Sequence, residues 1–178
     1  GGCFPYRSSS HRDVVPREEK NLGRSIIFVG RLEPRKRICD LIDAIAVLRK
    51  SEPDITLKIV GDGPEIEKAR ALVKQESLGE NVEFKGNVTD TKELADNYKK
   101  SDVLVLPSVS EGTPKVLPEA MSFGVIPVAC TKAGSTDYII ESGENGFLFE
   151  KKNVEALVLL LKTIKNMSKE QRDNIVSN

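Results

Sequence analysis

The sequence has no net charge, because its 178 residues include 27 Lys and Arg against 27 Asp and Glu. Nonspecific binding to nucleic acid depends on excess positive charge, so this balance argues against a nucleic-acid partner. Long apolar runs are also missing, since the best stretch, residues 156–161, falls far short of the roughly 20 residues that span a bilayer. With 39% hydrophobic residues and 13 glycines, the chain has the composition of an ordinary globular domain.

Cysteine and histidine are scarce, which limits the kinds of site that the chain can hold. Cys3, Cys39 and Cys130 are an odd number, lie far apart and lack C-x-x-C spacing, which argues against a disulfide framework or a zinc site. This use of cysteine fits a reducing, cytoplasmic setting. His11, the single histidine, precedes the first expected strand and is not expected to act as a catalytic base.

The start of the chain lacks the features of a natural N-terminus or a signal peptide. It begins at Gly1 without an initiator Met, a basic region or an apolar segment, so we interpret the sequence as a piece of a longer protein. Residues 1–24 have no apolar period and are predicted to form a linker. One domain is expected over residues 25–166, followed by a polar tail at 167–178.

Short β-branched runs alternate with segments of helical period from residue 25 onward. Strands are predicted at residues 25–29, 55–60, 82–85, 103–106, 125–129 and 145–149. Helices are predicted at residues 38–48, 64–75, 91–98, 118–123, 137–141 and 154–164. Because parallel neighbours need a right-handed crossover, this order predicts an α/β fold with a Rossmann-like, doubly wound parallel sheet of about six strands. Ligands of such sheets bind at the carboxyl ends of the strands.

Two cations follow the first predicted strand. Gly30 and Arg31 come directly after it, and Lys36 lies in the same loop. Arg can grip phosphate oxygens in a bidentate manner and Lys adds a compact charge, so a diphosphate is the ligand that these residues favour. The alternative is that both are solvated cations of a generic basic loop.

A glycine turn, Gly61-Asp62-Gly63-Pro64, joins the second strand to its helix. Such a turn can bring backbone amides close to an anion or a ribose. It does not complete the dinucleotide fingerprint G-x-G-x-x-G, since position 66 is Ile, so a nicotinamide dehydrogenase is not supported. The alternative is a plain strand-to-helix turn in which Asp62 caps the helix.

Two carboxylates, Glu111 and Glu119, flank a loop and the start of a helix after the fourth strand. One carboxylate can accept hydrogen bonds from neighbouring ribose hydroxyls, and the other can orient sugar hydroxyls or stabilise developing positive charge. Amides at the helix start can receive phosphate. The alternative makes Glu111 a solvated loop residue and Glu119 an ordinary acid in the first turn of a helix.

Over roughly residues 25–149, these strings resemble the nucleotide-binding half of retaining GT-B glycosyltransferases of the group 1 family. They are Phe28-Val29-Gly30-Arg31-Leu32 with Lys36, Ile59-Val60-Gly61-Asp62-Gly63-Pro64, Val82-Glu83-Phe84-Lys85-Gly86, Leu106-Pro107-Ser108 leading to the glutamates, and Asn145-Gly146-Phe147-Leu148. Two departures from the family pattern stand out. Arg37 takes the place of the usual Gly after the lysine, and Thr113-Pro114 replaces an aromatic-Gly pair, where Pro114 has no amide to donate.

The resemblance implies a role for each candidate residue. Arg31 and Lys36 would bind the donor diphosphate, and Glu119 would bind the ribose hydroxyls. Glu111 would be the catalytic residue near the donor sugar, and base contacts would lie near Val88. The remaining donor-binding residues would be Gly30, Gly61, Asp62 and Gly63 in the cleft, and Thr113, Lys115, Val116 and Leu117, whose amides would hold phosphate oxygens. No cofactor or bound metal is implied, because Arg, Lys and helix amides act in its place.

The resemblance also implies the reaction and its partners. The enzyme would be a hexosyltransferase-type glycosyltransferase that moves a sugar from a UDP-sugar or GDP-sugar to an acceptor hydroxyl, with retention, in polysaccharide or glycolipid biosynthesis. The chain would be its C-terminal half, inactive without the missing N-terminal acceptor-binding domain across the cleft. Lipid-linked acceptors would bring the full enzyme to the cytoplasmic face of a membrane as a peripheral protein. The alternative left open is a non-catalytic nucleotide-binding or interaction module, such as one chain of a split glycosyltransferase.

Overall fold

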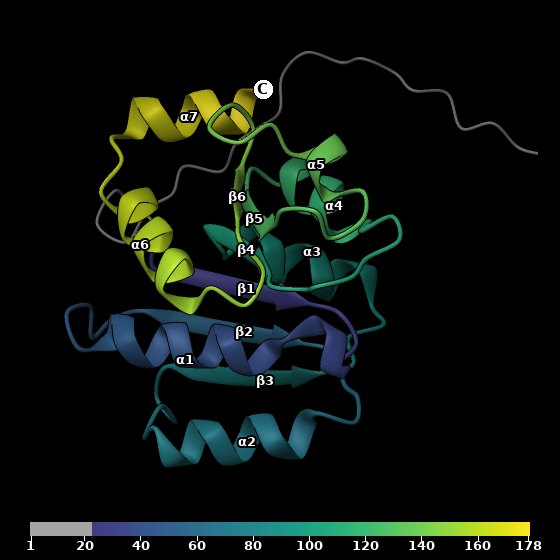
Figure 1. The fold of residues 1–178 in the computed structure, drawn as a ribbon, viewed down its shortest axis with the longest axis vertical. Helices are drawn as coiled ribbons and strands as arrows, with labels where there is room; N and C mark the ends of the chain where they lie inside the picture. The colour runs from purple at the N-terminus through teal and green to yellow at the C-terminus, as the bar shows by residue number, and fades with distance from the viewer. Residues whose placement is uncertain (1–22) are drawn as a thin grey trace, which may run out of the picture.

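The computed structural model describes residues 23–178 and contains a six-stranded parallel sheet in the order β3-β2-β1-β4-β5-β6 (Figure 1). Its strands are β1 (Ser25–Val29), β2 (Thr56–Val60), β3 (Val82–Gly86), β4 (Val103–Leu106), β5 (Ile126–Cys130) and β6 (Phe147–Phe149). The order grows from β1 toward one edge and from β4 toward the other, so the predicted doubly wound, Rossmann-like sheet is confirmed. The expected linker, Cys3 and His11 lie outside the described residues, apart from residues 23 and 24.

The helices cover both faces of this sheet, as doubly wound connections require. They are α1 (Ile38–Arg49), α2 (Ile66–Gln75), α3 (Thr91–Lys99), α4 (Val116–Ser122), α5 (Thr136–Ile139), α6 (Val154–Lys165) and α7 (Lys169–Ser177), and a 3-10 helix, Pro34–Lys36, precedes α1. α1 lies in front of the sheet in Figure 1 and contacts both α2 and α6. Within residues 23–178, no helix is long and apolar enough to cross a membrane.

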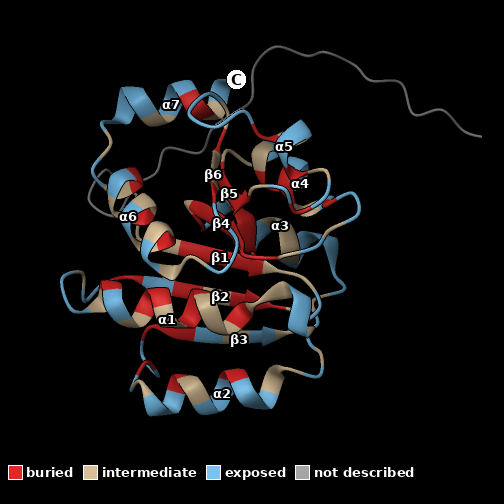
Figure 2. Ribbon diagram, in the orientation of Figure 1, coloured by how far each residue is buried: buried red, intermediate tan, exposed pale blue. Residues whose placement is uncertain are grey.

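The centre of the sheet is the most deeply buried part of the chain (Figure 2). Every residue of β4 and of β5 is buried, which fits the continuous apolar runs expected of strands covered on both faces. The edge strand β3 instead alternates between exposed residues and more buried ones. The loop that follows β4 therefore starts from a rigid, fully packed strand.

The ends of several elements differ from the prediction. β1 and β4 have the predicted bounds, whereas β6 is limited to Phe147–Phe149. α2 begins at Ile66 rather than at residue 64, and α4 begins at Val116 rather than at residue 118. Pro118 lies in the first turn of α4, where backbone amides have no partner within the helix, so a proline there does not mark the first residue of the helix. Pro64 precedes Glu65, the N-cap residue of α2, and lies outside that helix.

The C-terminal segment, residues 167–178, was expected as a polar tail and is instead largely helical. α7 begins with a capping box in which Ser168 and Gln171 bond each other's backbone amides. Its Ile175 is buried, and α7 contacts β5. The capping box was the signal in the sequence that could have predicted this helix.

Candidate functional site

The loops that follow β1, β2 and β3 are joined by backbone hydrogen bonds at the carboxyl edge of the sheet. The Gly30 amide donates to the carbonyl of the last residue of β2 at 3.0 Å, and the Leu32 amide donates to the Asp62 carbonyl at 2.9 Å. The Gly61 amide donates to the Gly86 carbonyl at 2.7 Å. The predicted glycine turn is therefore hydrogen-bonded on both sides, to the loop after β1 and to the end of β3.

Gly61 and Gly63 are required by the close approach of the first two loops. A Cβ atom on Gly61 would lie 1.9 Å from the Gly30 carbonyl oxygen, and one on Gly63 would lie 2.6 Å from the Leu32 carbonyl oxygen. The φ angles of +137° and +156° also lie in a region that favours glycine. Asp62 accepts a hydrogen bond from the Gly63 amide at 2.7 Å, whereas α2 has no side-chain cap, so Asp62 shapes the turn and does not cap the helix.

A cavity of about 560 Å³ lies where these loops meet the end of the sheet. It is lined by Val29, Gly30, Arg31, Val60, Gly61, Asp62, Gly63, Asn87, Val88 and Leu94. The cavity thus brings together most of the residues predicted from the first three strand ends, and its size is that of a small-molecule site. Asn87 and Leu94 were not predicted, although Asn87 directly precedes Val88 after the third strand.

Arg31 is the cation that lines this cavity. Its Nε atom lies 3.1 Å from a carboxylate oxygen of Glu33, and its side chain is 67% exposed. An exposed ion pair of this kind contributes about 0–1 kcal/mol. The guanidinium can therefore turn toward an anion in the cavity at little cost.

Lys36 and Glu111 form a close and largely buried ion pair. Nζ of Lys36 lies 2.5 Å from Oε1 of Glu111, and the two side chains are 12% and 6% exposed. Arg35 supplies a second cation, with Nη1 at 3.7 Å from Oε2 of Glu111, and donates a hydrogen bond to the Ser110 carbonyl at 2.9 Å. The Val109 amide donates to the Arg35 carbonyl at 2.9 Å. Glu111 is therefore not a solvated loop residue, and the loop after β1 is anchored to the loop after β4.

Lys36 and Glu111 do not line the cavity, so the structure does not bring them together with the predicted residues that do. The loop after β5 also approaches Glu111. A Cβ atom on Gly134, whose φ is +93°, would lie 1.9 Å from the Glu111 carbonyl oxygen. The Ser135 amide donates to the Gly112 carbonyl at 3.4 Å. A glycine shortly after a strand was the available signal for this contact, which was not predicted.

Glu119 lies in the first turn of α4 and is exposed, as expected, but it also has a buried neighbour. The Tyr98 hydroxyl donates to Oε2 of Glu119 at 3.3 Å. Tyr98 is 1% exposed, and its burial, reinforced by the nearby Glu119 carboxylate, raises the pKa of the hydroxyl. Tyr98 belongs to α3, which also supplies Leu94 to the cavity. α3 therefore connects Glu119 to the cavity.

The segment between the two glutamates has mixed surroundings. Thr113 and Lys115 are exposed, Val116 is half-buried and Leu117 is buried. The Leu117 amide donates to the Pro114 carbonyl at 3.1 Å. Because that amide already has an acceptor within the chain, Thr113, Lys115 and Val116 are the predicted residues of this segment whose amides could still hold a phosphate.

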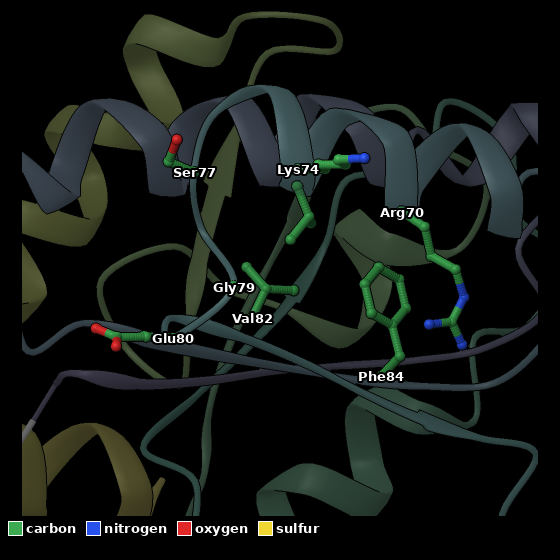
Figure 3. Close-up of a pocket in the computed structure, with 8 residues that line it drawn as sticks. Arg70, Lys74, Ser77, Gly79, Glu80, Val82 and Phe84 are labelled. Atoms are coloured by element: carbon green, nitrogen blue, oxygen red, sulfur yellow. The ribbon is translucent and has the colours of Figure 1, made fainter.

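A second cavity, of about 480 Å³, lies between α2 and β3 (Figure 3). Phe84 of β3 forms part of its wall, and the guanidinium of Arg70 lies over the Phe84 ring, 4.7 Å from the ring centroid. None of the predicted site residues lines this cavity.

The loop after β1 brings positive charge to the carboxyl edge, because it carries Arg31, Arg35 and Lys36. Within the part of the chain that the structure describes, no group of three or more His, Cys, Asp or Glu side chains could hold a metal ion. An anionic ligand at this edge would meet the Arg and Lys groups of the chain itself. This combination is typical of α/β domains that bind phosphorylated ligands at the ends of their strands.

Comparison with known proteins identifies the family. Residues 10–178 match the family model for glycosyl transferases group 1, and the chain belongs to this family. It is 37% identical over 135 residues to an uncharacterized glycosyltransferase of Haemophilus influenzae. That match covers 76% of this chain and 37% of the relative.

Solved structures share the fold. HepE of Anabaena, whose crystal structure was determined in complex with UDP-glucose, is 28% identical with a TM-score of 0.76, over 86% of this chain and 42% of HepE. The C-terminal domain of a glycosyl transferase group 1 family protein from Francisella tularensis is 30% identical with a TM-score of 0.76, over 86% of this chain and 80% of that one. The chain therefore spans less than half the length of HepE and of the Haemophilus relative.

Proposed function

We propose that the chain is the donor-binding, C-terminal domain of a retaining glycosyltransferase, which transfers a sugar from a nucleotide-sugar to an acceptor hydroxyl. The observation that carries the proposal is the cavity at the carboxyl edge of the sheet, where Arg31 and the glycine turn at 61–63 lie together. Family membership supports a nucleotide-sugar as the ligand. The crystal structure of HepE with UDP-glucose supports UDP as the nucleotide.

In this proposal the donor diphosphate binds to Arg31 and Lys36, which leave the same strand on one loop. The bond between the sugar C1 atom and the diphosphate oxygen breaks, and the electron pair stays on the diphosphate. These two cations stabilise the negative charge that develops there. The acceptor oxygen forms the new bond to C1, and its proton passes to the departing diphosphate oxygen.

The other parts of the donor are assigned to the neighbouring residues. Glu119 accepts hydrogen bonds from the ribose hydroxyls. Its contact with Tyr98 supports this role, because Tyr98 belongs to α3, which also supplies Leu94 to the cavity. The base lies near Val88, with Asn87 and Leu94 in the same wall. Glu111 lies nearest the donor sugar, and its burial beside two cations supports a carboxylate that is held in a defined position.

The acceptor-binding domain is proposed to precede this chain in the full-length enzyme. The match to a C-terminal domain structure supports this order, and the 37% coverage of the Haemophilus relative supports a longer full-length protein. A site that needs both halves makes the present chain competent to bind the donor and unable to transfer the sugar by itself. A hexose as the donor sugar, a polysaccharide or lipid-linked acceptor and a cytoplasmic location complete the proposal.

Thermal unfolding of the 178-residue chain with UDP, GDP, ADP and UDP-glucose tests the proposal. A ligand at about 100 times its Kd stabilises the folded state by about 2.7 kcal/mol, which raises the Tm of a domain of this size by roughly 5–10 °C. UDP and UDP-glucose are expected to give the largest shifts. If none of the four raises the Tm, the chain alone does not carry a donor site and the proposal is wrong.

A further inference from the structure

The Lys36–Glu111 ion pair conflicts with the idea that Lys36 binds the diphosphate and Glu111 contacts the donor sugar independently of each other. The proposed function gives Lys36 to the donor diphosphate, yet its Nζ atom lies 2.5 Å from a Glu111 oxygen. A carboxylate at this distance offsets most of the field that the ammonium group would present to a phosphate. Both side chains are largely buried, so salt and solvent screen the pair only weakly.

We propose that the donor diphosphate displaces Glu111 from Lys36, so that Glu111 becomes available to the donor sugar only after the diphosphate is in place. This inference rests on the proposed function, because it needs a diphosphate at Lys36. The exchange puts one anion in place of another beside the ammonium group. The exchange therefore avoids the cost of leaving a buried cation unpaired.

Arg35 allows the exchange because it remains beside Glu111 when Lys36 turns away. Its Nη1 atom already lies 3.7 Å from Oε2 of Glu111. The same guanidinium is anchored by hydrogen bonds to the Ser110 carbonyl at 2.9 Å and to Glu33 at 2.8 Å. A carboxylate that is 6% exposed needs such a partner, so the structure assigns Arg35 as a positioning residue for Glu111.

The backbone around the pair is fixed, so the exchange involves side chains only. The Val109 amide bonds the Arg35 carbonyl at 2.9 Å, which ties the loop after β1 to the loop after β4. Gly134 packs against the Glu111 carbonyl so closely that a Cβ atom there would lie 1.9 Å from its oxygen. Rotation of the Lys36 and Glu111 side chains is therefore the motion that changes the partners.

Calorimetric titration of UDP into the 178-residue chain, in a double-mutant cycle of Lys36→Met and Glu111→Gln, tests the exchange. Glu111→Gln is expected to bind UDP about fivefold more tightly than wild type, because the ammonium group no longer has a carboxylate partner to lose. In the Lys36→Met background the same substitution is expected to change the Kd by less than about twofold. General repulsion between Glu111 and the diphosphate would give the same gain in both backgrounds, which overturns the exchange.

Matched variants separate the exchange from a change in loop charge. Glu33→Gln removes a carboxylate that pairs with Arg31 and Arg35 but not with Lys36, so its effect on the Kd is expected to be equal with and without Lys36. Arg35→Met is expected to weaken UDP binding in the wild-type background, to lose that effect in the Glu111→Gln background, and to be rescued by Arg35→Lys. Weakening that persists without the Glu111 carboxylate overturns the positioning role.

The outcomes also separate this inference from the proposed function. A wild-type chain that binds none of UDP, GDP and ADP overturns both. UDP binding by wild type with no tightening in Glu111→Gln overturns the exchange alone and leaves the donor site standing. Thermal unfolding of every variant checks that it is folded, and Lys36→Gln replaces Lys36→Met in the cycle if the methionine variant is unfolded at 25 °C.

Discussion

Gly61→Ala is expected to destabilise the domain far more than one added methyl group would at an open site. The new Cβ atom would lie 1.9 Å from the Gly30 carbonyl oxygen. Because that oxygen belongs to the backbone, relief requires the loops after β1 and β2 to separate. Separation breaks the hydrogen bond from the Gly30 amide to β2 and the one from the Leu32 amide to the Asp62 carbonyl.

The magnitude follows from these two costs. A non-glycine residue held at a φ of +137° costs about 1–3 kcal/mol. Two lost backbone hydrogen bonds cost about 1–3 kcal/mol together. A total of about 4 kcal/mol lowers the Tm of a domain of this size by roughly 8–16 °C. Urea and thermal unfolding measure this loss, and the thermal shift with UDP is expected to disappear because the turn lines the cavity.

Gly79→Ala is the matched control, because no atom lies within 4 Å of the Cβ position there. This substitution is expected to change the free energy of unfolding by less than about 1 kcal/mol. It stabilises the domain if the lower conformational entropy of the unfolded chain dominates. The close approach of the two loops is refuted if the free energy of unfolding of Gly61→Ala lies within about 0.5 kcal/mol of the wild-type value. It is also refuted if Gly61→Ala loses no more stability than Gly79→Ala.

Three other substitutions test the site and the core. Arg31→Ala is expected to weaken UDP binding about tenfold or more and uridine binding much less, because the guanidinium is proposed to bind the diphosphate and not the nucleoside; equal losses in calorimetry contradict that role. Glu119→Gln keeps an acceptor for the Tyr98 hydroxyl and is expected to weaken UDP and uridine alike, about fivefold, so unchanged affinity removes the ribose role. Burial raises the pKa of the Cys130 thiol from 9.0 to about 12, so its contribution to stability is present below pH 9 and is lost as the pH rises toward 12. Cys130→Ala is therefore expected to lose less stability than wild type between pH 9 and 11 in urea unfolding, and parallel curves would contradict this.

The fold could be predicted because burial on both faces leaves a clear pattern in the sequence. β4 is apolar at every position, and α1 presents its buried residues at helical spacing. α7 left no such pattern, since Ile175 is its one buried residue and Val176 is its only other apolar residue. Helices that cover little of the core are therefore the elements that apolar periodicity misses.

The site could be predicted only in part, because strand ends are local features of the sequence and ion pairs are not. Arg31 and the glycine turn follow neighbouring parallel strands, so the sheet brings them together at one edge. Lys36 and Glu111 are 75 residues apart, and only the parallel pairing of β1 with β4 brings their loops into contact. The Tyr98 partner of Glu119 depends in the same way on the packing of α3 against α4.

Arg37 shows how the chain accommodates its departure from the family pattern at the position that usually holds Gly. Its φ of 53° and ψ of 39° are left-handed, a conformation that costs a residue with a Cβ atom about 1–2 kcal/mol. The Arg37 side chain donates two hydrogen bonds to Asp40, at 2.9 and 2.7 Å, a bidentate pair worth about 0.5–1 kcal/mol at a partly exposed position. Glycine would avoid the strain but would lose this pair and would add about 0.5–1 kcal/mol of backbone entropy to the unfolded chain. The two residues are therefore nearly equivalent here, and the loop conformation that carries Lys36 does not depend on a glycine at position 37.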